Sequence, residues 1–287
     1  MMDCNTVILN NGVEMPIIGL GTHTLSGIKM YKSVKHAYRA GYRNFDTAWL
    51  YKNESSLAWS LKFLGIERKD IFITSKLEWK QLVDNNLKGE QVKSVKTCFE
   101  STLRRLKTDY IDLYLIHWPN PKYYLYMWEE MIKLYEEGYI RAIGVSSFLE
   151  PHLEKLKTIS DVIPMVNQIE MHPLNNRFDL VKYCNENEIQ IEAHSPFARG
   201  ASAAELMCHP VLLDIARYHN RSVAQVILRW IIQQGCVTIP RSKNPERLVQ
   251  NIHIFDFELS EEEMTKIYSL NQDRFFGSDP RKTLAYL

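Results

Sequence analysis

"IDLYLIHWPNPKYYLYMWEEMIKLYEEGYIRAIGVS", residues 111–146, contains an apolar segment, an amphipathic segment and a second apolar segment. The runs 111–117 and 140–146 are short and rich in β-branched and aromatic residues, so they are predicted to be strands. The intervening "MWEEMIKLYEEG" is predicted to be a helix that ends at Gly138. A strand, a helix and a second strand in this order indicate a parallel pair joined by a right-handed crossover.

The same alternation of strands and helices continues along the 287 residues, without a Gly/Ser-rich linker. "TVILNNGVEMPIIGL" (6–20) predicts a hairpin with an Asn-Gly turn, leading into a strand at 16–20. Further strands are predicted at 42–46, 71–76, 163–168, 189–195 and 236–240, which makes eight after the hairpin. Eight units in a chain of this length predict a single domain, 1–287, of the α/β class: a (β/α)8 TIM barrel with an N-terminal β-hairpin.

Two helices between these strands carry clear signals. The segment 89–109 places apolar residues on one face: Val92, Val95, Phe99, Leu103 and Leu106. "SVAQVILRWIIQQG" is predicted to end at Gly235. A doubly wound open sheet is the rival architecture, and it would usually carry a GxGxxG motif after an early strand. "GLGTHTLSG" (19–27) lacks that spacing.

Composition excludes some classes of partner. The formal net charge is +1, with 35 basic and 34 acidic residues, so no general attraction to nucleic acid or acidic membranes is expected. No segment approaches the roughly 20 apolar residues of a membrane span, and the start "MMDCNTVILNNG" lacks the apolar run of a signal peptide. Cysteines are odd in number and form no CxxC pair, which favours free thiols in the cytoplasm: Cys4, Cys98, Cys184, Cys208 and Cys236.

Polar residues gather at the predicted carboxyl ends of the strands, where barrels carry their chemistry: Asp46, Lys76, His117, Ser146, Gln168 and His194. "FDTAWLYKNE" (45–54) adds Tyr51 just after the first of them. Each residue alone has a structural explanation, such as a helix cap, an extended lysine or a core histidine. Their shared position at one rim favours a reaction site.

These residue types are suited to proton transfer. A phenol has a pKa near 10, and an ammonium about 4 Å away interacts with it by roughly 4 kcal/mol at an effective dielectric near 20. We therefore expect Lys76 to lower the pKa of Tyr51, with Asp46 holding the lysine in place. His117 would orient a substrate oxygen, and Tyr51 would act as general acid. A metal-dependent barrel hydrolase is an alternative in which His23, His117 and His194 converge, but no HxH pair is present and no metal is expected.

Seven segments in order resemble landmarks of the aldo-keto reductases, in a branch with short, microbial-type substrate loops: "GVEMPIIGLGT", "FDTAWLYKNE", "ITSK", "DLYLIHWP", "GVSSF", "VNQIEMHP" and "IPRSKNPERLVQN". The resemblance runs from about residue 6 to "GSDP" (277–280). It implies a barrel that binds NADPH without a Rossmann motif and reduces aldehydes or ketones to alcohols by hydride transfer. Tyr51 is then the proton donor, Asp46 and Lys76 tune it, and His117 orients the carbonyl.

The resemblance also implies the NADPH/NADP-binding positions: Gly21, Thr22, Ser146, Ser147, Gln168, His194, Ser195, Phe197, Arg241, Ser242, Asn244, Arg247, Gln250 and Asn251. Ser146 and Gln168 match positions that bond the nicotinamide carboxamide, and 239–251 matches the adenosine-binding segment. The residues there agree with this role, because Pro245 suits the first turn of a helix whose free N–H groups attract an anion. Arg241 and Arg247 suit a 2′-phosphate, although a solvated basic helix start is the alternative.

Several positions depart from the family pattern. Ser147 replaces an Asn that touches the carboxamide, and His194 replaces the aromatic residue that stacks on the nicotinamide. His23 and Glu78 stand where apolar or aromatic residues are common, with Trp79 displaced by one. We expect a polar pocket for a substrate with a hydroxyl or positive group near its carbonyl; alternatively, His23 and Glu78 pair or face water. The substrate-pocket residues expected are His23, Trp49, Glu78, Trp79 and Trp118, with Tyr123 and Tyr124 as further wall or core aromatics.

The combined prediction is a monomeric, cytoplasmic, NADPH-dependent reductase of a small-molecule carbonyl substrate. An alternative from another class is a non-catalytic cofactor-binding auxiliary subunit, since this barrel also serves membrane channels in that role. The complete set Asp46, Tyr51, Lys76 and His117 favours the enzyme.

Overall fold

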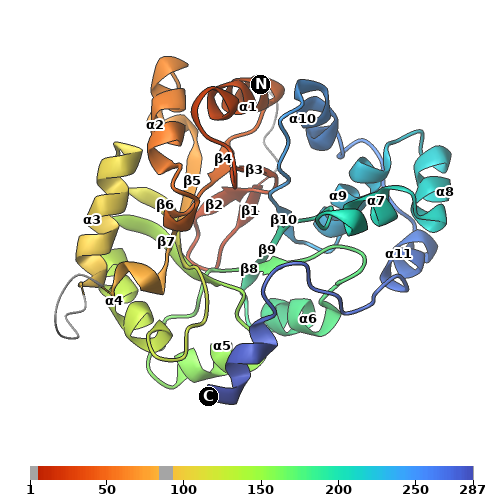
Figure 1. Ribbon diagram of the computed structural model, residues 1–287. Coiled ribbons are helices and arrows are strands. Elements are labelled where there is room, and N and C mark those ends of the chain that lie inside the picture. The colour runs from red at the N-terminus through yellow and green to blue at the C-terminus, as the bar shows by residue number, and fades with distance from the viewer. Residues whose placement is uncertain (1–5, 84–92, 287) are drawn as a thin grey trace.

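The barrel is built from eight parallel strands (Figure 1). The computed structural model describes residues 6–83 and 93–286. Neighbouring strands pair in chain order: β3 (Gly19–Gly21), β4 (Asn44–Asp46), β5 (Phe72–Leu77), β6 (Ile111–Ile116), β7 (Ile140–Ser146), β8 (Val166–Glu170), β9 (Gln190–His194) and β10 (Val237–Thr238). A parallel bridge between Ile18 and Thr238 joins the two edges, and Thr238 N donates to Ile17 O at 3.0 Å. The predicted closed barrel is confirmed and the doubly wound sheet is excluded.

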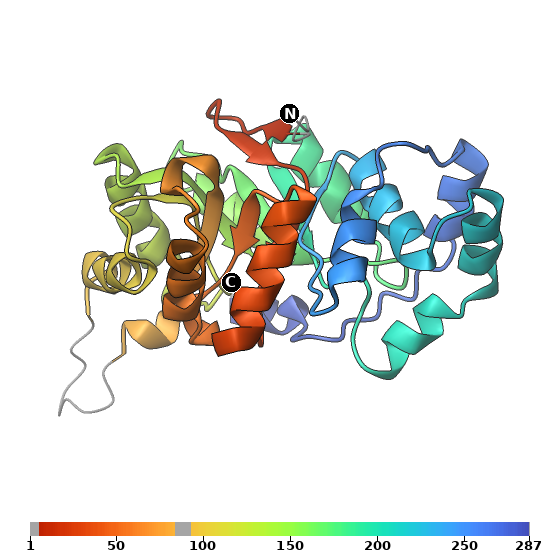
Figure 2. The same ribbon diagram turned by 90° about the horizontal axis from the view of Figure 1, so that it is seen from above.

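Helices form a ring around the strands (Figures 1 and 2). They are α1 (Gly27–Ala40), α2 (Glu54–Phe63), α3 (Val95–Leu106), α4 (Tyr124–Glu136), α5 (Glu150–Lys157), α6 (Phe178–Glu186), α7 (Ala201–Met207), α8 (Pro210–Tyr218), α9 (Val223–Gln233), α10 (Pro245–Ile252) and α11 (Glu261–Tyr268). Short 3-10 turns are η1 (Trp49–Tyr51), η2 (Arg68–Asp70), η3 (Trp79–Gln81) and η4 (Pro280–Tyr286). Within 6–83 and 93–286, none of the helices has the length and hydropathy needed to cross a membrane.

The predicted helix signals match the structure. Val95, Phe99 and Leu106 of α3 are buried against the barrel, and Val92 lies outside the described residues. Gly138 and Gly235 follow α4 and α9 with φ of 81° and 77°, each one residue beyond the cap, where a left-handed backbone favours glycine. Cys98, Cys184, Cys208 and Cys236 are free thiols, and Cys4 lies outside the described residues.

The N-terminal hairpin closes one end of the barrel. Its strands β1 (Thr6–Ile8) and β2 (Glu14–Pro16) are antiparallel, and Gly12 in the turn has φ of 83°. Side chains of Asn10 and Asn11 donate to backbone carbonyls that lie before or at the start of β7, β8 and β9: Arg141, Pro164 and Glu188. Figure 2 shows the hairpin on the face opposite the C-terminal turn η4. The carboxyl ends of the strands are therefore left open for a site.

Strand boundaries differ from the prediction by a few residues. β3 begins at Gly19 instead of residue 16, because Pro16 ends the hairpin and lacks an N–H for a central ladder. β8 runs to Glu170, two residues past the predicted end. Side chains alternate along a strand, so this extension places Glu170 on the same side as Gln168.

One buried carboxylate ties three strands together. Asp112 on β6 accepts from Arg68 at 2.5 Å, from Arg141 of β7 at 2.7 Å and from the backbone N–H of Ile73 on β5 at 2.9 Å. The Asp112 side chain is fully buried, so its charge depends on these donors. The cluster holds β5, β6 and β7 in register below the site.

Asp112→Asn should lower the free energy of unfolding by about 3 kcal/mol, because it leaves two guanidinium groups without their carboxylate. Asp214→Asn is the matched control, since Asp214 pairs with Arg217 on the surface with both side chains more than 70% exposed. The control should change the free energy by less than about 0.5 kcal/mol. Urea unfolding curves measure both variants, and equal midpoints would contradict this role of Asp112.

Candidate active site

Lys76, Asp46 and Tyr51 meet at the open end of the barrel. The fully buried Lys76 ammonium donates to Asp46 Oδ2 at 2.5 Å and to the backbone oxygen of Thr47 at 2.9 Å. It also lies against Tyr51, whose ring centroid is 5.0 Å from Nζ, and it lowers the pKa of the phenol. Lys76 and Asp46 come from β5 and β4, and Tyr51 ends the short turn η1 that follows β4.

Two imidazoles flank the Tyr51 ring. The His23 ring lies 4.8 Å from it and the His117 ring 5.8 Å, both edge to face. Burial lowers the pKa of His117 well below its usual value, and Lys76 and the other two pocket histidines lower it further. His117 is therefore neutral, so one ring nitrogen can donate a hydrogen bond. The four residues predicted to share one site do so.

Lys76 lowers the pKa of Tyr51, as predicted, but the net direction is upward. Burial raises the pKa of Tyr51 above its ordinary value of 10.0, and Asp46 adds to this rise. The loss of hydration outweighs the ammonium because the phenolate is the charged form. Tyr51 therefore keeps its proton at neutral pH.

Lys76 stays charged although it is buried. Burial lowers the pKa of Lys76, but Asp46 and Tyr51 raise it above the ordinary value of 10.5. The Asp46–Lys76 ion pair is thus maintained inside the barrel, as predicted.

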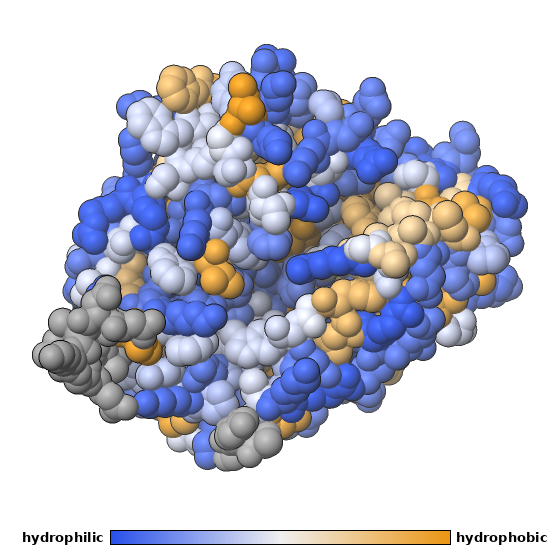
Figure 3. All heavy atoms as spheres, viewed as in Figure 1, coloured by the Kyte–Doolittle hydropathy of each residue, from blue (hydrophilic) through white to orange (hydrophobic). Residues whose placement is uncertain are grey.

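A cavity of about 1270 Å³ extends from this cluster to helix α10. It opens as a hollow in the face shown in Figure 3, where hydrophilic side chains border much of it. Most of the predicted site residues line it: Gly21, His23, Asp46, Tyr51, Glu78, Trp79, His117, Trp118, Ser146, Ser147, Gln168, His194, Ser195, Phe197, Arg241, Ser242, Arg247, Gln250 and Asn251. One continuous space therefore joins the predicted reaction site to the predicted adenosine site.

Four predicted residues lie outside the cavity lining. One is the fully buried Lys76, which is connected to the cavity wall through Asp46. Thr22 is buried and its Oγ1 donates to Asp46 O at 2.7 Å, so it supports the end of β4. Asn244 caps α10 by accepting from Arg247 N at 2.9 Å. Trp49 opens the turn η1, and the next two residues, Leu50 and Tyr51, face the cavity in its place.

The polar pocket residues do not pair with each other. Glu78 Oε2 lies 3.4 Å from His117 Nδ1, while His23 packs on Tyr51. Burial raises the pKa of Glu78 above its ordinary value of 4.5, and the nearby Lys80 offsets only part of this rise. Trp79 stacks on Tyr123 with centroids 5.8 Å apart, whereas Tyr124 is buried beside Phe148 in the core.

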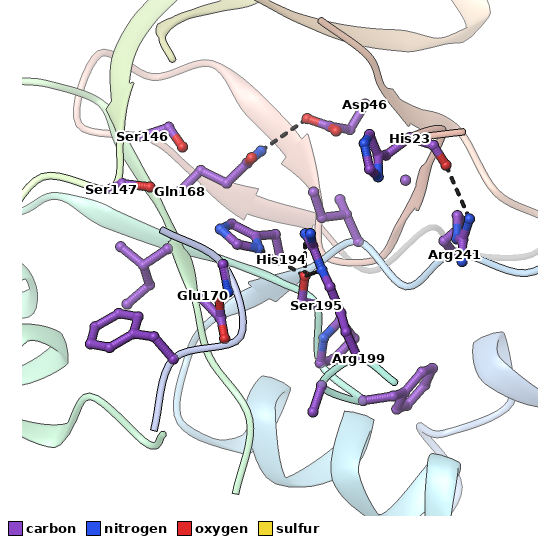
Figure 4. A pocket seen from close by; sticks show the side chains of 18 of the residues that line it. His23, Asp46, Ser146, Ser147, Gln168, Glu170, His194, Ser195, Arg199 and Arg241 are labelled. Carbon is purple, nitrogen blue, oxygen red and sulfur yellow. Dashed lines mark hydrogen bonds between the residues drawn. The ribbon is translucent and has the colours of Figure 1, made fainter. Parts of the chain in front are cut away.

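The middle of the cavity presents amide and imidazole groups (Figure 4). Gln168 Nε2 donates to Asp46 Oδ2 at 2.9 Å and to Glu192 Oε2 at 2.6 Å. Burial lowers the pKa of His194 to about 3, so its ring is neutral, and Nδ1 lies 3.1 Å from Ser195 Oγ. A neutral flat ring at this place is suited to stacking. Asn167 donates to Phe148 O at 3.0 Å and supports the strand end.

The far end of the cavity has the features of a phosphate site. Helix α10 begins at Pro245 with its N-terminus beside Ser242, and Arg247 lies in its first turn. Arg241 reaches back to Thr24 and to the carbonyl of His23. A Cβ at Gly21 would lie 2.8 Å from Ile239 O, so a side chain there would crowd the cavity wall. These residues fit an extended, phosphate-bearing dinucleotide.

Sequence reasoning did not single out three residues of the cavity wall. Arg199 donates to Ser195 Oγ at 3.0 and 3.2 Å (Figure 4). Glu170 accepts from the backbone N–H groups of Phe276 and Gly277 at 2.7 and 2.9 Å, which holds the C-terminal segment at the mouth. Arg177 also lines the cavity. Glu170 was detectable by continuing the alternation of β8, whereas nothing local marked the arginines.

The histidines near Tyr51 do not assemble a metal site. Across the part of the chain that the structure describes, no group of three or more His, Cys, Asp or Glu side chains is arranged to hold a metal ion.

Comparison with known proteins identifies the family. The profile of the Aldo/keto reductase family matches residues 17–272. The chain belongs to this family. It is 46% identical over 281 residues to glyoxal reductase of Bacillus subtilis (strain 168), covering 98% of each chain. It also resembles the crystal structure of MGS-M4, an aldo-keto reductase from a Medee basin deep-sea metagenome library. The TM-score is 0.87 at 38% identity, and the match covers 96% of this chain and 97% of that chain. A Gox0644 variant in complex with NADPH gives a TM-score of 0.87 at 33% identity, covering 96% of this chain and 97% of that one.

Proposed function

We propose that the protein is an NADPH-dependent reductase that converts small aldehydes or ketones into alcohols, with Tyr51 as the proton donor. The observation that carries this proposal is the Asp46–Lys76–Tyr51 cluster, in which Asp46 and Tyr51 line a cavity that continues to α10 and Lys76 is buried behind them. Membership of the aldo/keto reductases and the similarity to the Gox0644 variant solved in complex with NADPH support it.

When bound in this cavity, NADPH would supply the hydride for the substrate carbonyl carbon. Tyr51 gives its proton to the carbonyl oxygen, and the adjacent Lys76 ammonium stabilises the negative charge that forms on the phenol. Asp46 keeps Lys76 charged and in place. Neutral His117 donates an N–H to the same carbonyl oxygen and orients it toward Tyr51.

The nicotinamide end would be held by Gln168, Ser146 and Ser147, with His194 against the ring face. The remaining cofactor contacts would come from groups further along the cavity: Gly21, Ser195, Phe197, Arg241, Ser242, Arg247, Gln250 and Asn251. Thr22 and Asn244 would act indirectly, by supporting β4 and by capping α10.

The substrate end is polar, with His23 and Glu78 beside Tyr51 and His117 and with Trp79 and Trp118 as walls. We propose a small substrate that carries a hydroxyl, a second oxygen or a positive group next to the carbonyl. The similarity to glyoxal reductase supports a small two-oxygen substrate. The four free thiols support a reducing, cytoplasmic location, and we propose that the enzyme acts as a monomer.

A non-catalytic cofactor-binding subunit is the second candidate, because Ser147 and His194 change the nicotinamide contacts usual in the family. The complete proton-donor cluster favours catalysis.

Tyr51→Phe should retain NADPH binding and lose at least about 100-fold in kcat, because the proton donor is removed while the ring remains. NADPH absorbance against a panel of aldehydes measures turnover, and quenching of protein fluorescence measures binding. Tyr218→Phe, at a side chain 82% exposed on α8, is the control and should behave as native. Native turnover by Tyr51→Phe would overturn the assignment, and native protein that binds NADPH without any turnover would favour the auxiliary subunit.

Arg247→Ala should raise KM for NADPH about tenfold and leave KM for NADH within about twofold, because only NADPH has a 2′-phosphate for a charge-assisted hydrogen bond. Arg217→Ala on α8 is the control, since Arg217 pairs with Asp214 away from the cavity. An equal rise for both cofactors would contradict phosphate recognition by Arg247.

Glu78→Leu should lower the preference for hydroxyaldehydes over apolar aldehydes of equal length by about tenfold in kcat/KM, because the pocket loses a hydrogen-bonding group. Glu67→Leu, at an exposed surface pair with Lys69, serves as control. A native enzyme that prefers long apolar aldehydes would rule out the polar-substrate proposal.

A further inference from the structure

Glu192 is a fully buried carboxyl group that the proposed mechanism does not use. It lies on β9 opposite Gln168 of β8 and two residues before His194, so strand alternation turns its side chain into the barrel. Its Oε2 accepts from Gln168 Nε2 at 2.6 Å. A carboxyl group in the barrel interior, beneath the cofactor cavity, requires a physical explanation.

The charges around Glu192 do not balance if it is ionised. Lys76 from β5 is the nearby cation and Asp46 from β4 the nearby anion, and both act on Glu192. Lys76 donates to Asp46 and to Thr47 O and lies against Tyr51, and among residues 6–83 and 93–286 no hydrogen bond joins it to Glu192. One ammonium faces two carboxyl groups, and Asp46 is the one in direct contact with it. A second buried anion without its own cation is strongly unfavourable.

Two unpartnered oxygen atoms indicate where the proton resides. Glu192 Oε1 and Asn44 Oδ1 are both buried, and neither has a hydrogen-bond partner among residues 6–83 and 93–286. The Asn44 side chain lies close enough to Glu192 to lower its pKa. A proton on Oε1 would remove the charge from this unpartnered atom and leave Oε2 as the acceptor for Gln168.

The pKa of this group agrees with the geometry. Burial raises the pKa of Glu192 to about 7, and Asp46 adds to the rise, while Gln168, Lys76 and Asn44 oppose it. Glu192 is thus protonated in mildly acidic solution and loses its proton as the pH passes neutrality.

The orientation of Gln168 follows from the same network. Asp46 Oδ2 and Glu192 Oε2 both take hydrogens from Gln168 Nε2, at 2.9 and 2.6 Å. A reversed amide would place Gln168 Oε1 against the Asp46 carboxylate, where both groups are acceptors. The NH2 group therefore faces the barrel interior, and the amide oxygen is left for the cavity that Gln168 lines.

We propose that Glu192 is a positioning residue, protonated beneath the cofactor site, that holds the Gln168 amide oxygen toward the nicotinamide carboxamide. This inference rests on the proposed use of NADPH. When Glu192 ionises, a second negative charge faces Lys76 and weakens its support of the Tyr51 phenolate. Ionisation of Glu192 would then affect both the hydrogen bond of Gln168 to the cofactor and proton donation by Tyr51.

Infrared difference spectra of the native protein test the proton directly. At about pH 5.5 most exposed Asp and Glu side chains are ionised, so a carboxylic-acid C=O band that disappears by about pH 8.5 reports a buried acid. The band should be present in native protein, absent in Glu192→Gln, and unchanged in Glu186→Gln, whose carboxyl is 63% exposed on α6. A native protein without the band overturns the proton assignment.

Kinetics and binding test the positioning role. Native kcat should fall several-fold as the pH rises through about 7, and Glu192→Gln should remove that fall because its amide side chain cannot ionise.

The binding measurement compares two variants. Glu192→Leu should raise the Kd of NADPH about tenfold, because Gln168 loses an acceptor, whereas Glu192→Gln keeps an acceptor and should bind NADPH about as tightly as native protein. A fall in kcat that persists in Glu192→Gln, or native NADPH affinity in Glu192→Leu, overturns the role of Glu192. Absence of carbonyl reduction at every pH, with the acid band present, would instead overturn the proposed function.

Discussion

The buried ion pair between Lys76 and Asp46 is the interaction on which the site depends. Charges inside a barrel are tolerated when they are paired and hydrogen-bonded, and here Thr47 O accepts from Lys76 while Gln168 donates to Asp46. The pair links β4 to β5 and, through Gln168, to β8 across the barrel. Removing either charge would therefore disturb the proton donor, the amide that faces the cavity and the packing of the barrel end together.

The rest of the fold serves to hold that end open. The hairpin closes the opposite end through Asn10 and Asn11, and the Asp112 cluster ties β5, β6 and β7 beneath the site. At the mouth, Glu170 holds the backbone of Phe276 and Gly277, so the C-terminal segment completes the wall of the cavity. Burial is as important as charge there, because it keeps Tyr51 protonated and His117 and His194 neutral.

The sequence predicted the barrel because its signals are local: apolar runs, amphipathic helices and glycines one residue past helix ends. It also predicted which side chains meet, since the carboxyl ends of parallel strands share one rim. The sequence-based prediction failed for properties, such as the pKa of a buried group, that depend on opposing effects of several neighbouring groups. Lys76 lowers the pKa of Tyr51 as expected, yet burial raises it by more. Trp49 lies outside the cavity lining because a turn of three residues sends neighbouring side chains in different directions.

Residue types and strand order alone thus determined the closed barrel, the open rim and the identity of the four residues around the Tyr51 hydroxyl. Tertiary structure decided the state of each group: which carboxyl pairs with Lys76, which one has no cation of its own, and which way the Gln168 amide is turned. The physical reason is that strand periodicity is encoded in neighbouring residues, whereas hydration and charge are set by atoms that come together only across the folded barrel.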